Sequence, residues 1–325
     1  MRPVDSVHLA HVAHVLPVAA RRWWRGCLAL GLVSAALTGC SATAPGRPGA
    51  PPSATGVTAE RSAVTFATGS RATPASAQDL RRSVAVLRER AKGTGLTGTR
   101  IGTRGGALTL TGPYAADRLR ALGAPGSLTL RPVLAVDRGV ASPAGSGTPG
   151  TNPVGGTGAE GVSAALRARY AALDCSHGGT PAAADPRAPV AVCAAHGPLG
   201  EPPEKYLLGP AVLTGHDVTS AESLQDPATG ALWLVRLRFT AAGGTAYADA
   251  AARLARHPAP RDELATVVDG TVLSAPAMTG EPTGRTALLH GSRTETEARN
   301  LAAELDSGAL PIPLRFTGAR RLPGG

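Results

Sequence analysis

The chain has 325 residues, which is enough for two small folded domains once its glycine- and proline-rich stretches are set aside. Aromatic residues make up only 3% of the chain, so its hydrophobic cores must be built from Val, Leu and Ala. The net charge of +10 would suit nucleic acid or an anionic membrane. The arginines are scattered and lack interleaved aromatic residues, so no nucleic-acid partner is expected.

The first segment, residues 1–39, has the layout of a secretory signal peptide. A positive region that contains Arg21-Arg22 is followed by an apolar run from Cys27 to Leu37. This run of about 11 residues is too short to cross a membrane, which takes about 20. The two arginines also fit a twin-arginine signal, although their flanking residues favour the general secretory route.

The letters LTGC at 37–40 span the end of the signal peptide and resemble the lipobox of bacterial lipoproteins. The resemblance implies that Cys40 becomes the first residue of the mature chain and carries acyl chains such as palmitate. Two acyl chains give stable anchoring, here at the outer face of the cytoplasmic membrane, where one chain is marginal. Residues 40–60 are rich in Ser, Ala, Pro and Gly and are predicted to form a flexible tether.

Residues 61–136 are predicted to form a small α+β domain with the element order β-α-β-β-α-β, which is the ferredoxin-like pattern. The expected elements are strands at 63–67, 97–103, 106–111 and 127–136 and helices at 76–92 and 114–122. Ser76 is a suitable cap for the first helix, and the apolar residues of that helix fall on one face. Residues 137–158 are Gly, Pro, Ser and Thr with almost no large apolar residue, and are predicted to be a linker.

Residues 159–204 are predicted to hold one helix, at 160–172, and an irregular insert with two cysteines. The other two cysteines of the chain belong to the leader, so Cys175 and Cys193 are expected to form a disulfide in an exported protein. The disulfide would close a loop of about 17 residues and stabilise the fold by about 3 kcal/mol.

Residues 205–317 are predicted to form a second α+β domain, followed by a tail at 318–325. Alternation over 231–239 places Trp233, Val235, Leu237 and Phe239 on one side of a half-buried strand. Asp269-Gly270 is typical of a hairpin turn, and Thr294 with Glu297 forms a capping box for a helix. The proline-containing segment that follows this helix is expected to run along a sheet edge.

No residues combine into a catalytic set, so the chain is predicted not to be an enzyme and to bind no cofactor. Asp269 reads as a turn residue, and Asp217 as the cap of a short helix at 217–224. Ser274 lacks the Gly-x-Ser-x-Gly elbow of a nucleophile. His177 and His196 lie close to the two cysteines, but their spacing is not that of known zinc sites and oxidised cysteines cannot bind metal, so no metal is expected.

Several motifs resemble the first extracytoplasmic domain of the protein-export factor SecD. In the second predicted domain they are KYLLGPAVLTGHDV at 205–218, FTAAG at 239–243 with Tyr247, VVDGTVLSAP at 267–276 and EARNLAAELDSGALPIPL at 297–314. Two weaker matches, VLRERAKGTG at 86–95 and LTLRPV at 128–133, lie in the first domain. The cysteine-containing insert resembles actinobacterial versions. The resemblance implies an α+β fold of two ferredoxin-like α/β-sandwich subdomains, called base and head.

In SecD the segment after the last motif leads into transmembrane helices that pair with SecF and carry a proton pathway. This sequence ends at Gly325, so it is expected to lack the motor. The resemblance implies a lipid-anchored accessory of protein export, whose partners are Sec translocon components or unfolded exported polypeptides. The alternative is a cell-envelope lipoprotein that uses the same fold for another partner. No binding residue can be nominated from the motifs.

Overall fold

The computed structural model describes residues 60–323 except 70–74, 138, 141–161, 177–184, 198–202, 228–229, 231, 281, 283 and 292–293. The predicted signal peptide and Cys40 therefore lie outside the described residues, as do nearly all of the tether and most of the linker. Among the residues that are described, no helix is long and apolar enough to cross a membrane.

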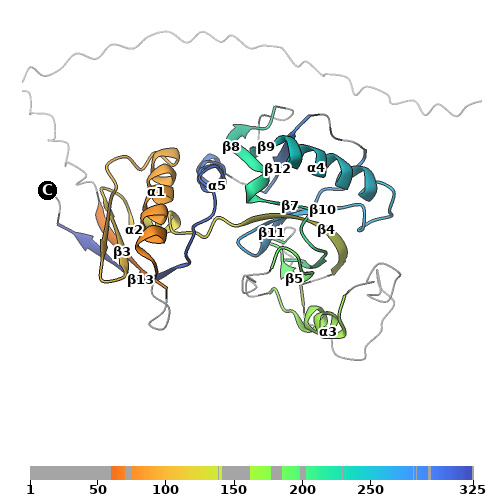
Figure 1. Ribbon diagram of the computed structural model, residues 1–325, viewed down its shortest axis with the longest axis horizontal. Coiled ribbons are helices and arrows are strands. Elements are labelled where there is room, and N and C mark those ends of the chain that lie inside the picture. The colour runs from red at the N-terminus through yellow and green to blue at the C-terminus, as the bar shows by residue number, and fades with distance from the viewer. Residues whose placement is uncertain are drawn as a thin grey trace, which may run out of the picture. The chain divides into compact units, whose positions relative to one another are not determined.

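The base is a four-stranded antiparallel sheet with two helices packed on one face (Figure 1). Its elements are β1 (Arg61–Thr68), α1 (Ala77–Gly93), β2 (Arg100–Arg104), β3 (Ala107–Gly112), α2 (Ala116–Ala121) and β13 (Leu314–Leu322). The strand order is β13-β1-β3-β2. Helix α1 begins at the predicted cap, where the Ser76 side chain accepts a hydrogen bond from the Asp79 amide at 3.1 Å. Val64, Leu87 and Leu110 lie at the centre of the base core.

The head contains the remaining strands, in two sheets. They are β4 (Leu128–Asp137), β5 (Val190–Cys193), β6 (Lys205–Leu208), β7 (Leu213–Thr214), β8 (Val218–Gln225), β9 (Trp233–Phe239), β10 (Leu264–Val268), β11 (Thr271–Ser274) and β12 (Thr286–Leu289). The larger sheet has the order β11-β10-β4-β6-β5, with β7 also paired to β4, and the smaller sheet has the order β12-β9-β8. The helices are α3 (Ala164–Ala172), α4 (Ala241–Leu254) and α5 (Glu295–Asp306), together with the 3-10 turn η1 (Gly215–Asp217).

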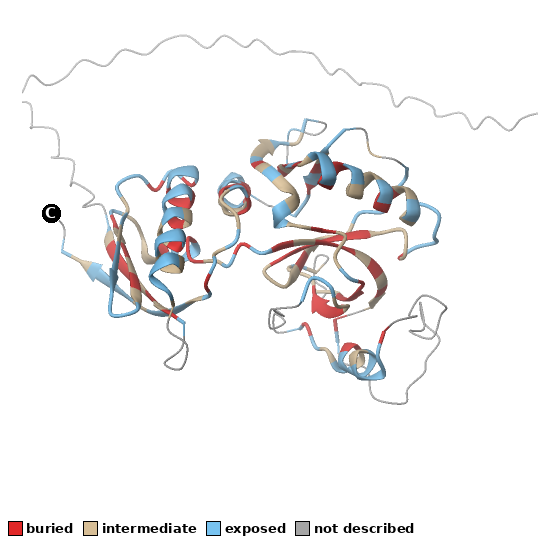
Figure 2. Ribbon diagram, viewed as in Figure 1, coloured by how far each residue is buried: buried red, intermediate tan, exposed pale blue. Residues whose placement is uncertain are grey.

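Strand β4 contributes to three hydrophobic cores of the head, and its Ala135 lies in the one that contains Tyr170 of α3. Leu128 and Leu130 pack with α5 and the smaller sheet, whereas Val133 packs among the strands of the larger sheet. Figure 2 shows the resulting run of buried residues along this strand. The alternation predicted for β9 is confirmed, because Val235, Leu237 and Phe239 are buried in the first of these cores and Trp233 packs against it.

The α+β fold of base and head is confirmed, but the fourth strand of the base is not the predicted one. The segment expected to end the first domain at 136 is β4, which pairs with β10, β6 and β7. Its place in the base is taken by β13, which pairs with β1. The base therefore continues past the predicted domain end at 317 and into the predicted tail. Both segments have strand-like sequences, and the choice of partner depends on packing between distant parts of the chain.

A second difference concerns residues 217–224, where the strand β8 begins at Val218 in place of the predicted helix. The Asp217 carboxylate accepts from the Thr214 amide at 2.8 Å and from its hydroxyl at 3.2 Å, so it holds the single turn η1. The chain then continues as β8 and pairs along β9. A capping motif thus supports one turn here, and pairing with the neighbouring strand overrides helix propensity beyond it.

Candidate functional site

The larger sheet of the head curls until its two edge strands meet. Just beyond β5, Ala194 forms a parallel bridge with Val272 of β11, and the Ala195 amide donates to the Val272 carbonyl at 2.8 Å. The five strands therefore form a nearly closed small barrel. Its interior is filled by eight buried residues: Val133, Val190, Val192, Tyr206, Leu208, Ala265, Val267 and Val272.

A cavity of about 840 Å³ opens onto this barrel and is the candidate site. Its wall includes Thr129 and Arg131 of β4, Val190 and Val192 of β5, and Val267 of β10. Its rim comes from connecting segments at 185–186, 214–216, 269–270 and 308–309. Cavities of this size with mostly apolar walls and a few polar groups are typical of ligand sites in proteins, and the mouth of a barrel is a common place for them.

Arg131 supplies the charge in the cavity wall. Its side chain is buried, with a relative exposure of 1%. The guanidinium donates to the Ala188 carbonyl at 2.8 Å, the Gly209 carbonyl at 3.0 Å and the Asp185 carbonyl at 3.1 Å, and also to the Thr129 hydroxyl at 3.1 Å. Burial lowers the pKa of Arg131, but a guanidinium stays protonated at any physiological pH. The cavity therefore combines a mostly apolar wall with a buried arginine whose donors are taken up by protein oxygens, and its lining also includes the acidic residues Asp185 and Asp269. The sequence analysis did not single out Arg131.

Asp269 lies on the rim of the cavity and is a turn residue, as predicted. Its φ angle of 49° and that of Gly270, 77°, are those of a tight hairpin turn. The Asp269 carboxylate accepts from the Ser127 amide at 2.7 Å and from the Ser127 hydroxyl at 3.1 Å. His216 lies on the same rim, whereas Ser274 is not among the lining residues.

Cys175 and Cys193 form a disulfide in the structure, with their Cα atoms 5.6 Å apart. The bond ties the segment after α3 to the end of β5. Within the described part of the chain, no cluster of three or more His, Cys, Asp or Glu residues is arranged to hold a metal ion. His177 lies outside the described residues, and His196 is described.

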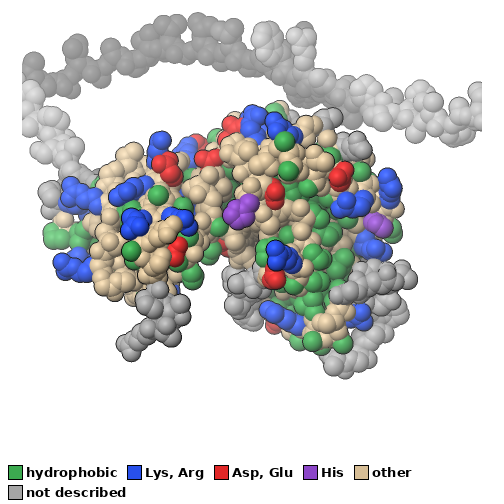
Figure 3. Space-filling model, in the orientation of Figure 1, with side chains coloured by type: hydrophobic (Ala, Val, Ile, Leu, Met, Phe, Trp, Pro, Cys, Tyr) green, Lys and Arg blue, Asp and Glu red, His purple; other side chains and the backbone are tan. Residues whose placement is uncertain are grey.

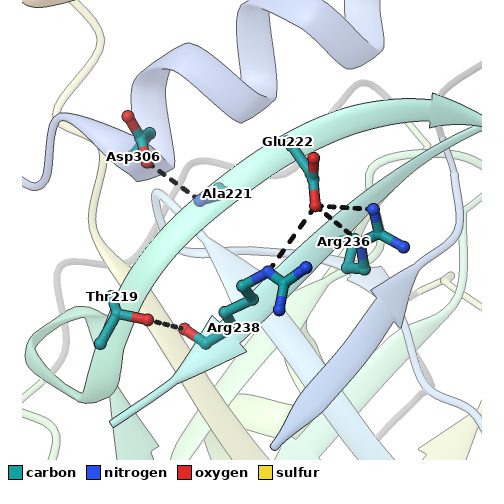
Figure 4. A network of polar contacts seen from close by, with 6 residues as sticks. All are labelled: Thr219, Ala221, Glu222, Arg236, Arg238 and Asp306. Carbon is teal, nitrogen blue, oxygen red and sulfur yellow. Dashed lines mark hydrogen bonds and ion pairs between the residues drawn. The ribbon is translucent and has the colours of Figure 1, made fainter.

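A polypeptide could also bind by pairing as an extra strand with an exposed sheet edge. The smaller sheet is a weaker candidate for this than the cavity, because a side chain of α5 already bonds to its β8 edge. The Asp306 carboxylate of α5 accepts a hydrogen bond from the Ala221 amide at 3.1 Å (Figure 4). On the outer face of the sheet, Glu222 lies 2.7 Å from Arg236 and 3.8 Å from Arg238. A carboxylate on an edge amide is one way in which proteins block pairing with another chain.

A buried arginine joins the two connections between base and head. Arg90 of α1, with a relative exposure of 1%, donates to carbonyls of the segment that leads into β4, at Leu122, Ala124 and Pro125. The same side chain donates to the Ser307 hydroxyl at 3.0 Å and to the Gly308 carbonyl at 2.9 Å, just after α5. Arg90 therefore links three segments that are far apart in the sequence.

Glu304 of α5 lies close to this arginine and to Asp269. Burial raises the pKa of Glu304 to about 8, and the charge of Asp269 adds to the rise, while Arg90 opposes it. The Glu304 carboxyl is therefore protonated through most of the physiological pH range. A protonated carboxyl can donate to the Asp269 carboxylate, which two ionised groups could not do.

The structure combines a ferredoxin-like base with a head that contains a small barrel. Comparison with known proteins agrees with this arrangement. Residues 194–312 match the family model "SecDF, P1 head subdomain". The crystal structure of SecDF in its super-membrane-facing form is similar over 81% of this chain and 30% of that chain, with a TM-score of 0.50 and 22% identity. This likeness concerns the fold.

The curated relatives are translocase subunits. The chain is 35% identical over 156 residues to protein translocase subunit SecD of Streptomyces coelicolor, which covers 47% of this chain and 27% of the relative. It is 34% identical over 116 residues to SecD of Acidaminococcus fermentans, and this alignment covers 36% of this chain and 26% of the relative. The chain thus spans about a quarter of the length of these two relatives. The matched region is homologous to the P1 head subdomain of SecDF.

Proposed function

We propose that this protein is an accessory of protein export, held at the outer face of the cytoplasmic membrane through lipid on Cys40, that contacts exported polypeptides with its head. The observation that carries the proposal is the match of residues 194–312 to the SecDF P1 head. The relatives are named as subunits of the protein translocase. The proposal extends a role in protein export from them to the present chain.

The barrel-mouth cavity is the proposed contact site. Its mostly apolar wall suits the apolar side chains that an unfolded polypeptide exposes, and its volume of about 840 Å³ has room for several of them. Arg131 holds the cavity wall together through its buried hydrogen bonds, so binding would depend mainly on the apolar side chains. Hydrophobic side chains also gather on the surface around the barrel, as Figure 3 shows. A site of this kind recognises a class of side chains and not one sequence.

The lipid anchor would set the working distance from the membrane. The tether from Cys40 to the first described strand has the composition of a flexible coil. A coil of about 20 residues has a root-mean-square length of about 25 Å. The head would therefore work close to the membrane surface, where exported chains emerge from a translocon.

In-cell cross-linking of the tagged protein, followed by mass spectrometry of what is captured, tests the proposal. The expected result is recovery of Sec channel subunits or many unrelated exported chains, with a clear decrease for Cys40→Ala, which cannot be acylated. Thr129→Trp, which fills part of the cavity from a half-exposed position, should reduce capture of exported chains and leave membrane attachment intact. Capture of a single unrelated envelope partner, without any Sec component, would contradict the export role.

A further inference from the structure

The face of the base sheet opposite the two helices carries a regular pattern of side chains. Val64, Leu108 and Leu110 point towards the helices, so the alternate residues of each strand lie on the other face. The strand register places these residues in three cross-strand rows: Arg100, Thr111, Ala63 and Arg320; Gly102, Thr109, Thr65 and Gly318; and Arg104, Ala107, Ala67 and Arg315. We call this the open face of the base.

Arginines occupy the four corners of the open face. Arg100 and Arg104 come from the edge strand β2, and Arg315 and Arg320 come from the opposite edge strand β13. All four are exposed. Strands lie about 4.8 Å apart and rise about 3.3 Å per residue, so the corners frame a patch about 14 Å wide and 13 Å long.

The open face has no compensating negative charge. The four strands of the base contain six arginines and no Asp or Glu, and Arg61 lies on the same face at the start of β1. Within the described part of the chain, none of the four corner arginines forms an ion pair closer than 4.0 Å. Surfaces of mixed sign are the rule on proteins, so a one-signed patch of this kind indicates an anionic partner.

The centre of the open face is small and flat. It consists of Ala and Thr, and the hydroxyls of Thr65 and Thr109 lie 3.4 Å apart across the two central strands. Such a surface can approach a flat array of headgroups closely. It has no aromatic side chain on which a nucleobase could stack, whereas sheets that bind single-stranded nucleic acid depend on such stacking.

We propose that the open face of the base docks on the surface of a bilayer that contains anionic lipids. Charge complementarity is the first argument, because four corner arginines can each contact a lipid phosphate. The second is position: β1 begins at Arg61, directly after the proposed tether, so the base is the folded part nearest to the anchor. The inference deepens the proposed function, since a docked base would fix the height of the head above the membrane.

Vesicle co-sedimentation of the full chain tests the proposal. Cys40→Ser is introduced in every sample, so that no acyl chain contributes and the leader is a common background. The chain that keeps all four corner arginines is compared with the fourfold variant R100Q/R104Q/R315Q/R320Q on vesicles of phosphatidylglycerol and phosphatidylcholine. Each basic residue near an anionic surface is worth about 1 kcal/mol, or about fivefold in affinity, so the fourfold variant should bind at least 100-fold more weakly.

The matched control, R81Q/R82Q/R88Q/R256Q, removes the same charge from exposed positions on α1 and after α4. It should bind within about fivefold of the unsubstituted chain, and thermal melting checks that both variants remain folded. An equal loss in the control would overturn the proposal, since net charge alone would then explain binding. Binding to pure phosphatidylcholine that matches the mixed vesicles, or equal binding to soluble DNA, would overturn it as well.

The outcome is separable from that of the proposed function. The vesicle assay requires neither acylation nor an exported polypeptide, and the capture experiment does not require the corner arginines. A protein that captures exported chains but ignores anionic vesicles would overturn only the docking inference.

Discussion

The base and the head expose opposite chemistry. The base leaves one face of its sheet open, and that face is small, polar and framed by arginines. The head curls its larger sheet into a nearly closed barrel and presents a cavity with a mostly apolar wall. The same low-aromatic composition thus gives two surfaces, because one sheet is covered by helices on a single side and the other is curled on itself. One surface suits charged headgroups, and the other suits apolar side chains.

The largest expected effect comes from removing the link between these two regions. Arg90→Met should lower the free energy of unfolding by about 4 kcal/mol, because it leaves several carbonyls around Leu122 and Gly308 without a donor. Urea denaturation measures the change. Arg88→Met, two residues earlier on the exposed side of α1, should change stability by less than about 0.5 kcal/mol. A similarly small effect of Arg90→Met would mean that base and head are stable independently.

The disulfide is expected to stabilise the head and not the base. Replacing Cys175 and Cys193 by Ser should cost about 3 kcal/mol, through the greater freedom of the unfolded loop. Hydrogen exchange should show the loss of protection around α3 and β5, with little change in β1 and β3. Equal loss across both regions would indicate that they unfold as one unit.

The pH dependence of stability should carry a contribution from Glu304. Its pKa is raised to about 8 in the folded state, so the folded protein holds this proton more tightly than the unfolded chain does. Stability should therefore be highest near pH 5 and fall as the pH rises towards 8, by about 3 kcal/mol for this group. Glu304→Gln should flatten that part of the curve, as measured by thermal melts from pH 5 to 9. An unchanged slope would contradict the assignment.

The smallest effect is expected on the outer face of the smaller sheet. Glu222→Gln removes the carboxylate between Arg236 and Arg238, and exposed ion pairs of this kind contribute at most about 1 kcal/mol to stability, which thermal melting would measure.

Asp306→Asn should have a larger consequence for association than for stability, because the β8 edge would lose its charge. Analytical ultracentrifugation of the Asp306 variant would detect new oligomers.

The sequence predicted elements better than it predicted partners. Ser76, the Asp269-Gly270 turn and the alternation in β9 were all readable, because capping, turn and half-burial patterns are local. The exchange of β4 and β13 between the two regions could not be predicted. Both segments have the sequence pattern of strands, and only the packing of distant residues decides their neighbours. Arg131 and Arg90 were missed for a related reason. Each is an ordinary arginine in the sequence, and its role depends on carbonyls from other parts of the chain.

Site-specific photo-cross-linking in living cells would test the central claim most directly. A photoreactive amino acid at His216, on the exposed rim of the cavity, is compared with the same group at Arg256, an exposed position that does not line it. We expect adducts with exported polypeptides at position 216 that increase when export is slowed, and few or none at 256. Equal labelling at the two positions, or no adduct with an exported chain at 216, would contradict the account.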